Sequence, residues 1–110
     1  MISPLAKKHC VPCRGGTPPL PADAQQRLLR ELDADWQIED GHRLHKEYGF
    51  KNFVDALAFV NHVAQVAEEE GHHPDVFLAW GKVRLTVWTH AIDGLTESDF
   101  VLAAKADAVL

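Results

Sequence analysis

The order in which the hydrophobic period changes along the chain constrains the fold more than any other feature. Residues 36–38 alternate between apolar and polar, a turn signal follows at 40–41, and residues 44–50 alternate again. Residues 76–80 and 83–89 form a second pair of β-rich runs with only two residues between them. Each pair predicts a β-hairpin. The turns are Asp40-Gly41 and Gly81-Lys82, and the alternating run after the first turn is Leu44, Lys46, Tyr48 and Phe50.

A long helical segment lies between the two hairpins. Asn52 is a good N-cap, Asp55 stands at the third helical position, and Gly71 supplies a stop. The spacing of the apolar residues between these signals predicts a helix that buries one face. The residues expected on that face are Phe53, Leu57, Val60, Ala64 and Ala67.

Two further helices flank the hairpins. Pro21 can open the first, which continues to about Asp33, and Thr96 with Asp99 forms a pair similar to a capping box that opens the last. The resulting order is α-β-β-α-β-β-α. Hairpins interrupted by helices predict a four-stranded antiparallel sheet with helices packed on one face, which is an α+β fold. The expected apolar positions are Ala24, Leu28, Leu29 and Leu32 in the first helix and Phe100, Leu102, Ala103 and Ala106 in the last.

The first 20 residues are rich in glycine and proline, which predicts a flexible N-terminal arm followed by a single domain over 21–110. The arm carries Cys10 and Cys13 in a CxxC spacing beside His9. Such a pair suits a metal or a redox couple, but a zinc site needs four ligands, and the residues that follow do not resemble a redox helix. We therefore expect two reduced thiols on an arm that has little to bury and can be deleted without loss of stability or activity.

Charge and hydropathy exclude several classes of protein. The formal net charge is −5, so the chain has no cationic surface for nucleic acid or for an anionic membrane. No apolar run approaches the ~18 residues of a membrane span, and no hydrophobic stretch follows the basic residues near the N-terminus, as it would in a secretory signal. We therefore expect a cytoplasmic protein that contacts neither nucleic acid nor membrane directly.

The chemically informative segment is 68–74, at the end of the central helix. Its carboxylates stand at the negative end of the helix dipole, where they are locally unfavourable. A histidine just beyond that end is favoured in its cationic form by the dipole and by Glu68. A protonated histidine available near neutral pH is what general acid catalysis requires. The segment reads Glu68-Glu69-Glu70-Gly71-His72-His73-Pro74, and the proline biases His73 to an extended conformation.

Two other interpretations of this segment stay open on spacing alone. The imidazoles could simply cap the helix by bonding its last carbonyls. A metal site is the weaker alternative, because adjacent histidines on an extended chain chelate one ion less readily than a pair four residues apart on a helix.

The last predicted strand ends at His90, on the same face as Arg84, Thr86 and Trp88. A lone histidine at a strand end is more often a surface residue than a catalytic one. A tryptophan on the polar face indicates that another subunit covers it, so we expect a homodimer or homotetramer. Asp99 has a structural role in the capping box beside any functional one.

Taken together, these residues resemble the pattern of the pterin-4a-carbinolamine dehydratase family. That pattern is an acidic residue, three residues, His-His-Pro, five or six residues, an aromatic residue, nine residues, a histidine and a later aspartate. The resemblance covers roughly residues 20–107, and the arm with its CxxC resembles bacterial members. In this sequence the pattern reads Glu68, His72-His73-Pro74, Trp80, His90 and Asp99.

The resemblance implies a dehydratase. In the family's reaction, 4a-hydroxytetrahydropterin loses water to give the quinonoid dihydropterin, which recycles the cofactor of aromatic amino-acid hydroxylases. By resemblance, His72 and His90 would transfer protons and His73 would orient the pterin. Histidine can both deliver a proton to the departing hydroxyl and accept one from the ring near pH 7 without a metal. We therefore expect no metal and no cofactor, since the pterin is the substrate.

The resemblance also assigns supporting roles and partners. Glu68 and Asp99 would position or tune the imidazoles, and Pro74 and Trp80 would shape the pocket. An aromatic amino-acid hydroxylase is a candidate partner. The alternative is a non-catalytic binding role on the same fold, either as a dimerisation partner of a transcription factor or in the assembly of a carbon-fixing enzyme. Those assembly proteins tend to lose the histidines that this chain keeps.

Overall fold

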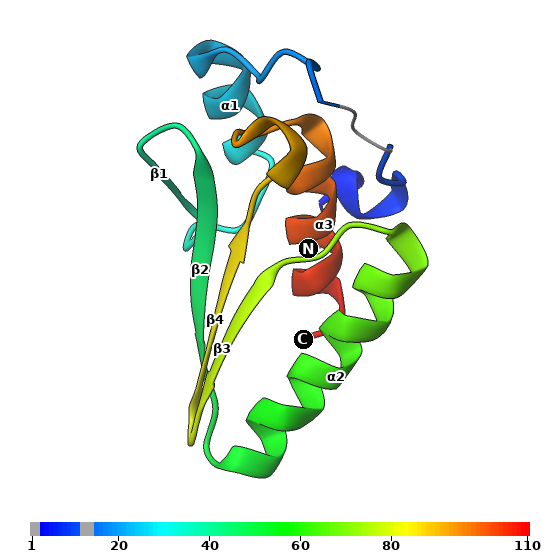
Figure 1. Ribbon diagram of the computed structural model, residues 1–110. Helices are drawn as coiled ribbons and strands as arrows, with labels where there is room; N and C mark the ends of the chain where they lie inside the picture. The colour runs from blue at the N-terminus through cyan, green and yellow to red at the C-terminus, as the bar shows by residue number, and fades with distance from the viewer. Residues whose placement is uncertain (1–2, 12–14) are drawn as a thin grey trace.

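The computed structural model describes residues 3–11 and 15–110 (Figure 1). Its elements follow the predicted order α-β-β-α-β-β-α, which confirms the α+β class. The helices are α1 (Ala22–Leu29), α2 (Phe53–Glu70) and α3 (Glu97–Ala108), with short 3-10 helices η1 (Pro4–Lys7) and η2 (His90–Ile92). The strands are β1 (Gln37–Glu39), β2 (Arg43–Gly49), β3 (Asp75–Ala79) and β4 (Lys82–Val87).

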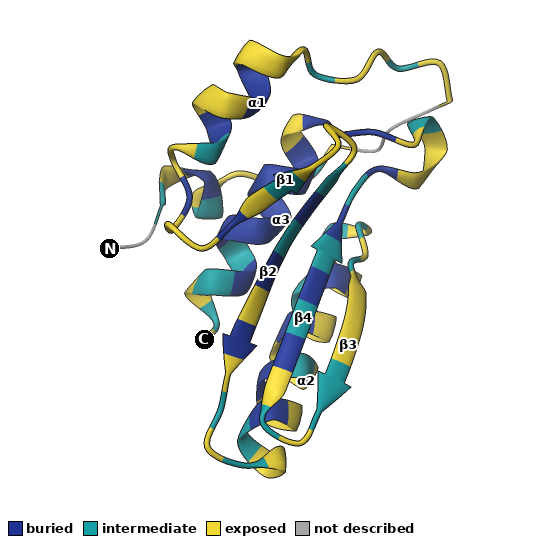
Figure 2. Cartoon of the chain, turned by 90° about the vertical axis from the view of Figure 1, so that its left-hand side faces the viewer, coloured by how far each residue is buried: buried dark blue, intermediate teal, exposed yellow. Residues whose placement is uncertain are grey.

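The strands form one antiparallel sheet in the order β1-β2-β4-β3. In the central pair Leu44 lies opposite Val87 and Tyr48 opposite Val83. Because side chains alternate across a strand, these residues share one face, and the alternation of buried and exposed residues along β2 and β4 is visible in Figure 2. Helices α2 and α3 cover the buried face, while α1 packs against α3 at one end (Figure 1). The predicted packing of helices on one face is confirmed.

The first helix is shorter than predicted. It ends at Leu29, and the backbone N–H groups of Glu31 and Leu32 donate to carbonyls three residues earlier, at 3.0 and 3.1 Å. Such bonds tighten the last turn of a helix. Leu32 nevertheless stays buried, as the sequence pattern indicated.

The central helix begins and ends where its caps predict. Asn52 Oδ1 accepts the backbone N–H of Asp55 at 2.8 Å, and Gly71 ends the helix in the left-handed region with φ 64°. The predicted apolar stripe, however, is wrong for most of its residues, because α2 is apolar on more than one side and the sheet takes the neighbouring face. The buried residues are Ala56, Phe59, Val63 and Ala67, whereas Phe53, Leu57 and Ala64 are exposed.

A buried polar cluster joins the end of α3 to the first hairpin. Asp107 Oδ1 accepts from Lys46 Nζ at 2.9 Å and from the Tyr48 hydroxyl at 2.6 Å, and its Oδ2 accepts from Trp36 Nε1 at 2.8 Å. Burial, together with the hydrogen bond to Asp107, raises the pKa of Tyr48 far above its usual range. Lys46 can therefore occupy a core-facing position because its charge is paired.

The N-terminal arm differs from its prediction. Leu5 is only 1% exposed, Lys105 Nζ donates to the Ala6 carbonyl at 2.8 Å, and η1 packs against α3. The expectation that the arm has little to bury is therefore wrong for residues 3–11, since one well-placed leucine and a few backbone hydrogen bonds suffice. Cys13 lies outside the described residues.

Among the described residues, no helix combines the length and the apolar content that crossing a bilayer requires.

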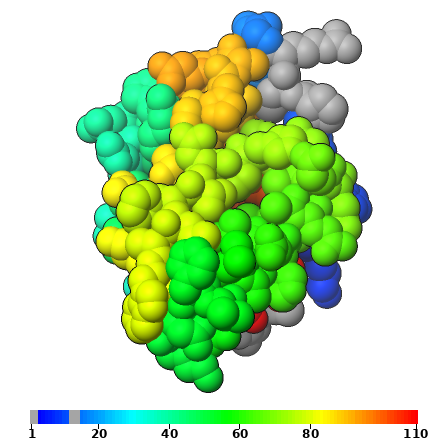
Figure 3. Space-filling view, turned by 60° about the horizontal axis from the view of Figure 1, so that its bottom comes forward, coloured from blue at the N-terminus to red at the C-terminus, as the bar shows by residue number. Residues whose placement is uncertain are grey.

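The apolar surface of the molecule gathers away from the strand face on which Trp88 led us to expect it. Trp88 is half-buried within its own chain, with the Arg43 guanidinium 4.2 Å from its ring centroid. The first turns of α2 and the hairpin of β3 and β4 lie together at the other end of the molecule (Figure 3). Their exposed apolar side chains, here called the apolar patch, are Phe53, Val54, Leu57, Val76, Phe77 and Trp80.

We predict that the apolar patch holds copies of the chain together as a dimer or tetramer, because exposed apolar surface of this kind marks association sites. Light scattering at micromolar concentration should give a multiple of the monomer mass. Replacing Phe77 and Trp80 together by Ser should lower that mass, whereas Leu110→Ser, at an exposed apolar residue outside the patch, should not. A wild-type protein that is strictly monomeric would contradict the prediction.

Candidate active site

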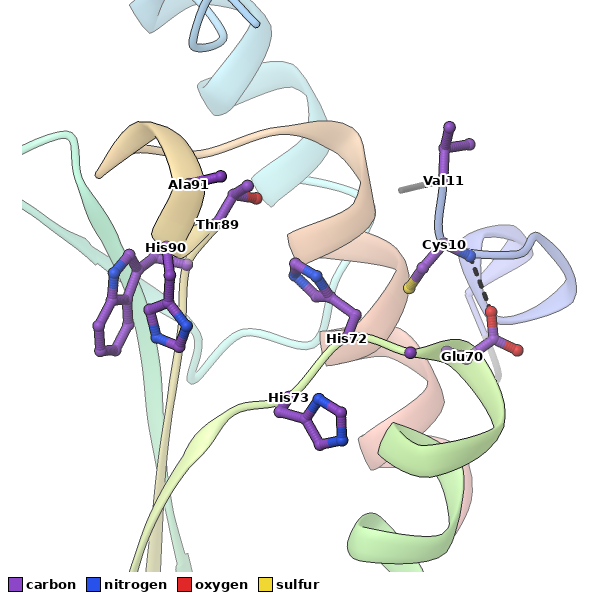
Figure 4. Close-up of a pocket in the computed structure, with 10 residues that line it drawn as sticks. Cys10, Val11, Glu70, His72, His73, Thr89, His90 and Ala91 are labelled. Carbon is purple, nitrogen blue, oxygen red and sulfur yellow. Dashed lines mark hydrogen bonds between the residues drawn. The ribbon is translucent and has the colours of Figure 1, made fainter. Parts of the chain in front are cut away.

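A cavity of about 280 Å³ opens where the end of α2, the end of β4 and the N-terminal arm meet (Figure 4). It brings together the three histidines that the sequence singled out, although they come from segments 18 residues apart. The size is just under the roughly 300–1,000 Å³ typical of small-molecule pockets. Its walls are formed by Cys10, Val11, Glu70, Gly71, His72, His73, Trp88, Thr89, His90 and Ala91.

His72 is held by a fully buried carboxylate. Its Nε2 lies 2.6 Å from Oδ1 of Asp99, which is 0% exposed. The other oxygen, Oδ2, accepts the Thr89 hydroxyl at 2.9 Å and the backbone N–H of Thr96 at 2.8 Å. The left-handed turn at Gly71 makes this contact reachable, because it turns the chain off the helix axis directly before His72. Asp99 thus serves the capping box and the histidine at the same time.

The two adjacent histidines face different carboxylates. Nε2 of His73 contacts Oε2 of Glu68, and both side chains are more than half exposed. The imidazole of His72 faces inward to Asp99 instead. Only the backbone N–H of His72 bonds a helix carbonyl, that of Ala67 at 3.2 Å. The interpretation of the rings as simple helix caps is therefore not supported for either histidine.

His90 stands on the opposite wall. It is the first residue of η2, and its ring packs edge-on against Trp88 with the ring centroids 4.2 Å apart. The loop that follows is closed by paired backbone bonds between Thr89 and Gly94, with N–H···O distances of 2.9 and 3.5 Å. The exposed imidazole of His90 is therefore carried by a short, braced loop.

Two of the residues assigned by resemblance lie outside the cavity wall. Pro74 directly follows His73 and is half-buried, but it does not line the cavity. Trp80 must be corrected, because it lies in the turn between β3 and β4 and is 68% exposed. Strand β3 carries the chain about 17 Å away from the histidines, given about 3.3 Å per residue over its five residues. Within this chain Trp80 does not shape the cavity.

Sequence reasoning missed the contribution of the arm and of Glu70. Glu70 Oε1 accepts the backbone N–H of Cys10 at 2.8 Å, and Oε2 lies 3.0 Å from Nδ1 of His9 and 3.8 Å from Nζ of Lys105. The hydrogen bond from the Cys10 amide is the main reason why the pKa of Glu70 lies below its ordinary value of 4.5. Burial opposes this shift, and His9 and Lys105 reinforce it. No sequence signal separated Glu70 from the carboxylates beside it.

The arrangement suits acid–base chemistry on a small ligand. An ionised Asp99 only accepts hydrogen bonds, so Nε2 of His72 carries the proton between them and Nδ1 remains as the second titratable ring nitrogen. His73 and His90 add two further imidazoles around the same cavity. Among residues 3–11 and 15–110, no three His, Cys, Asp or Glu side chains are grouped as a metal ion would require.

Comparison with known proteins places this geometry in context. The family model for pterin 4 alpha carbinolamine dehydratase matches residues 18–109. A protein of Alkaliphilus metalliredigens, provisionally named a pterin-4-alpha-carbinolamine dehydratase, is 53% identical over 103 residues, which cover 94% of this chain and 93% of that protein. A protein of Rubrobacter xylanophilus with the same provisional name is 54% identical over 106 residues, which cover 96% of this chain and 98% of that protein.

Solved structures share the fold. A crystal structure from Brucella melitensis, described as a transcriptional coactivator/pterin dehydratase, has a TM-score of 0.78 and 35% identity, covering 84% of this chain and 98% of that one. A pterin dehydratase-like protein described as a RuBisCO assembly factor of the alpha-carboxysome has a TM-score of 0.59 and 26% identity, covering 68% of this chain and 88% of that one.

The lowered pKa of Glu70 makes the contact with the arm resistant to mild acid. A carboxyl whose pKa is depressed on folding contributes stability above its ordinary pKa and loses it as the pH falls through the lowered value. The amide proton of Cys10, followed by NMR during an acid titration, should therefore shift with a midpoint below 4.5. Glu70→Gln cannot titrate and should abolish this transition. A midpoint at or above 4.5 in the unmodified protein would contradict the assignment.

Proposed function

The chain belongs to the pterin 4 alpha carbinolamine dehydratase family, and from this membership we propose that it removes water from 4a-hydroxytetrahydropterin to give the quinonoid dihydropterin. The single observation that carries the proposal beyond family membership is the buried pair of His72 and Asp99, which lines a cavity shared with His73 and His90. Its chemical class is that of a hydro-lyase, and it would serve the recycling of a tetrahydropterin cofactor for aromatic amino-acid hydroxylases.

The reaction needs a proton at one site of the pterin and a base at another. The C4a–O bond breaks as the hydroxyl accepts a proton and leaves as water, and the cation that remains loses a ring N–H proton. His72 and His90 stand on different walls of the cavity, so one imidazole can act as the acid and the other as the base. Both assignments of the two roles agree with the geometry.

Asp99 is the positioning residue for His72 in this proposal. By holding Nε2–H it fixes the tautomer and the orientation of the ring, and it stabilises the imidazolium that forms when Nδ1 takes a proton. His73 would orient the pterin, with Glu68 holding its ring from the solvent side. Pro74 would contribute by restricting the backbone of His73.

Partners and location follow the same reasoning. We propose a homo-oligomer that works beside an aromatic amino-acid hydroxylase in the cytoplasm. A non-catalytic role remains the alternative, since the two structural relatives described above include a coactivator and an assembly factor. The dehydratase is favoured because a purely structural protein has no need for an inward-facing histidine on a buried carboxylate.

Replacing single histidines tests the proposed roles. His72→Ala and His90→Ala should each lower kcat roughly 10²–10⁴-fold, the range for losing one general acid or base. His73→Ala should raise KM more than it lowers kcat, because an orienting contact acts in the ground state and in the transition state alike. The assay is the decay of the 4a-carbinolamine, read above the uncatalysed rate, with melting temperatures measured in parallel.

A matched control is available on the same helix that leads into the site. His62 is an exposed histidine of α2 outside the cavity wall, and His62→Ala should keep wild-type kinetics. If His72, His73 and His90 could all be replaced with wild-type turnover, the histidines would be structural and the proposal would fail.

Metal independence stays a prediction, based on the ability of imidazoles to move both protons. Dialysis of the protein against a strong chelator should leave kcat and KM unchanged. A large loss of turnover that zinc restores would overturn it.

A further inference from the structure

One wall of the histidine cavity comes from the N-terminal arm. Cys10 and Val11 line the cavity opposite the end of β4, and Figure 4 shows the Cys10 amide bonded to Glu70 at the rim. The other walls belong to α2, its following turn and the end of β4, which are parts of the packed core. The arm reaches the cavity from a chain position about 60 residues away from the histidines it faces.

Glu70 attaches this wall through a charged contact. Its side chain is only 8% exposed, and its two oxygens contact the Cys10 amide and the His9 ring. A hydrogen bond from a backbone N–H to an ionised carboxylate is about twice as strong as one between neutral groups. The adjacent carboxylate of Glu69 is exposed and turns to the other side of α2. Only Glu70 of this neighbouring pair therefore holds the arm.

Ser98 attaches the same segment from α3. Its Oγ accepts the backbone N–H of Val11 at 2.9 Å and donates to the Val11 carbonyl at 3.2 Å. Ser98 directly precedes Asp99, and Glu70 stands two residues before His72. The arm is thus bound to the same two chain segments that hold the buried pair of the site.

We propose that residues His9–Val11 form a substrate-contacting wall of the cavity, and that Glu70 is the positioning residue that keeps this wall closed on the pterin. The proposal rests on the dehydratase function proposed above. A wall that contacts the substrate without taking part in proton transfer contributes equally to binding of the ground state and the transition state. Glu70 and Val11 therefore set KM and leave kcat to the histidines. The arm is then not dispensable, contrary to what its composition predicted.

Limited proteolysis tests the attachment independently of any activity. Lys7 and Lys8 lie just before the attached segment, and trypsin cleaves there at a rate governed by local opening of the arm. Glu70→Ala should increase the rate several-fold, whereas Glu69→Ala should leave it unchanged. Glu70→Gln keeps an acceptor oxygen for the Cys10 amide and should lie between the two. Equal rates for Glu70→Ala and Glu69→Ala would overturn the role of Glu70.

Steady-state kinetics on the same variants test the wall. Glu70→Ala should raise KM roughly three- to tenfold, as expected for losing about one hydrogen-bonded contact, with kcat within about twofold of wild type. Val11→Ala trims the wall without touching its attachment, so it should raise KM while tryptic cleavage stays at the wild-type rate. Faster cleavage of Glu70→Ala with an unchanged KM, or a loss confined to kcat, would overturn the proposal.

Direct binding separates a failure of this inference from a failure of the proposed function. The probe is 7,8-dihydrobiopterin, followed by quenching of protein fluorescence in wild type, Glu70→Ala and Glu69→Ala. If wild type binds the probe more tightly than Glu70→Ala but has no turnover, the wall stands and the dehydratase function falls. If wild type neither binds the probe nor turns over the carbinolamine, both are overturned.

Discussion

The carboxylate of Asp99 is the interaction on which the rest of the site depends. A fully buried carboxylate is tolerated only where hydrogen-bond donors surround it, and here each donor comes from a different part of the chain. The Thr96 amide belongs to the start of α3, the Thr89 hydroxyl to the end of β4, and the His72 ring to the segment after α2. One side chain therefore fixes the meeting point of two helices and the central strand pair. The cavity lies at that point because these elements converge on Asp99 there and then diverge toward solvent.

Local signals explain which parts of the fold were predictable. The turn residues and caps, such as Asp40-Gly41, Asn52 and Gly71, act within a few residues of themselves, and the elements they predict are present. The buried face of α2 was not predictable, because its sequence offers more than one apolar face and only packing against the sheet selects Phe59 and Val63 over Phe53 and Leu57. Lys46 likewise reads as an interruption of an apolar run until Asp107, distant in the chain, is seen to pair with it.

The candidate site was predictable to the extent that its residues follow a family pattern at fixed spacing. His72, His73 and His90 share one cavity, and Asp99 lies beneath it, as that pattern implied. Trp80 failed because spacing along a chain says nothing about the direction in which a strand runs. Glu70 and the arm failed for a different reason: their contacts join residues about 60 positions apart, and a carboxylate in an acidic run carries no mark of the partner it will meet.

The pairing of Lys46 with Asp107 has a consequence for the order of events during synthesis of the chain. The two residues are 61 positions apart, so at about 5–20 residues per second Asp107 is made about 3–12 s after Lys46. Until then the ammonium group has no carboxylate to accompany it into the interior, and the first hairpin must keep that side of β2 in water. The first strands to leave the ribosome are thus among the last to reach their final burial. For those seconds the nascent chain exposes an unfinished sheet, which is the kind of surface that molecular chaperones recognise.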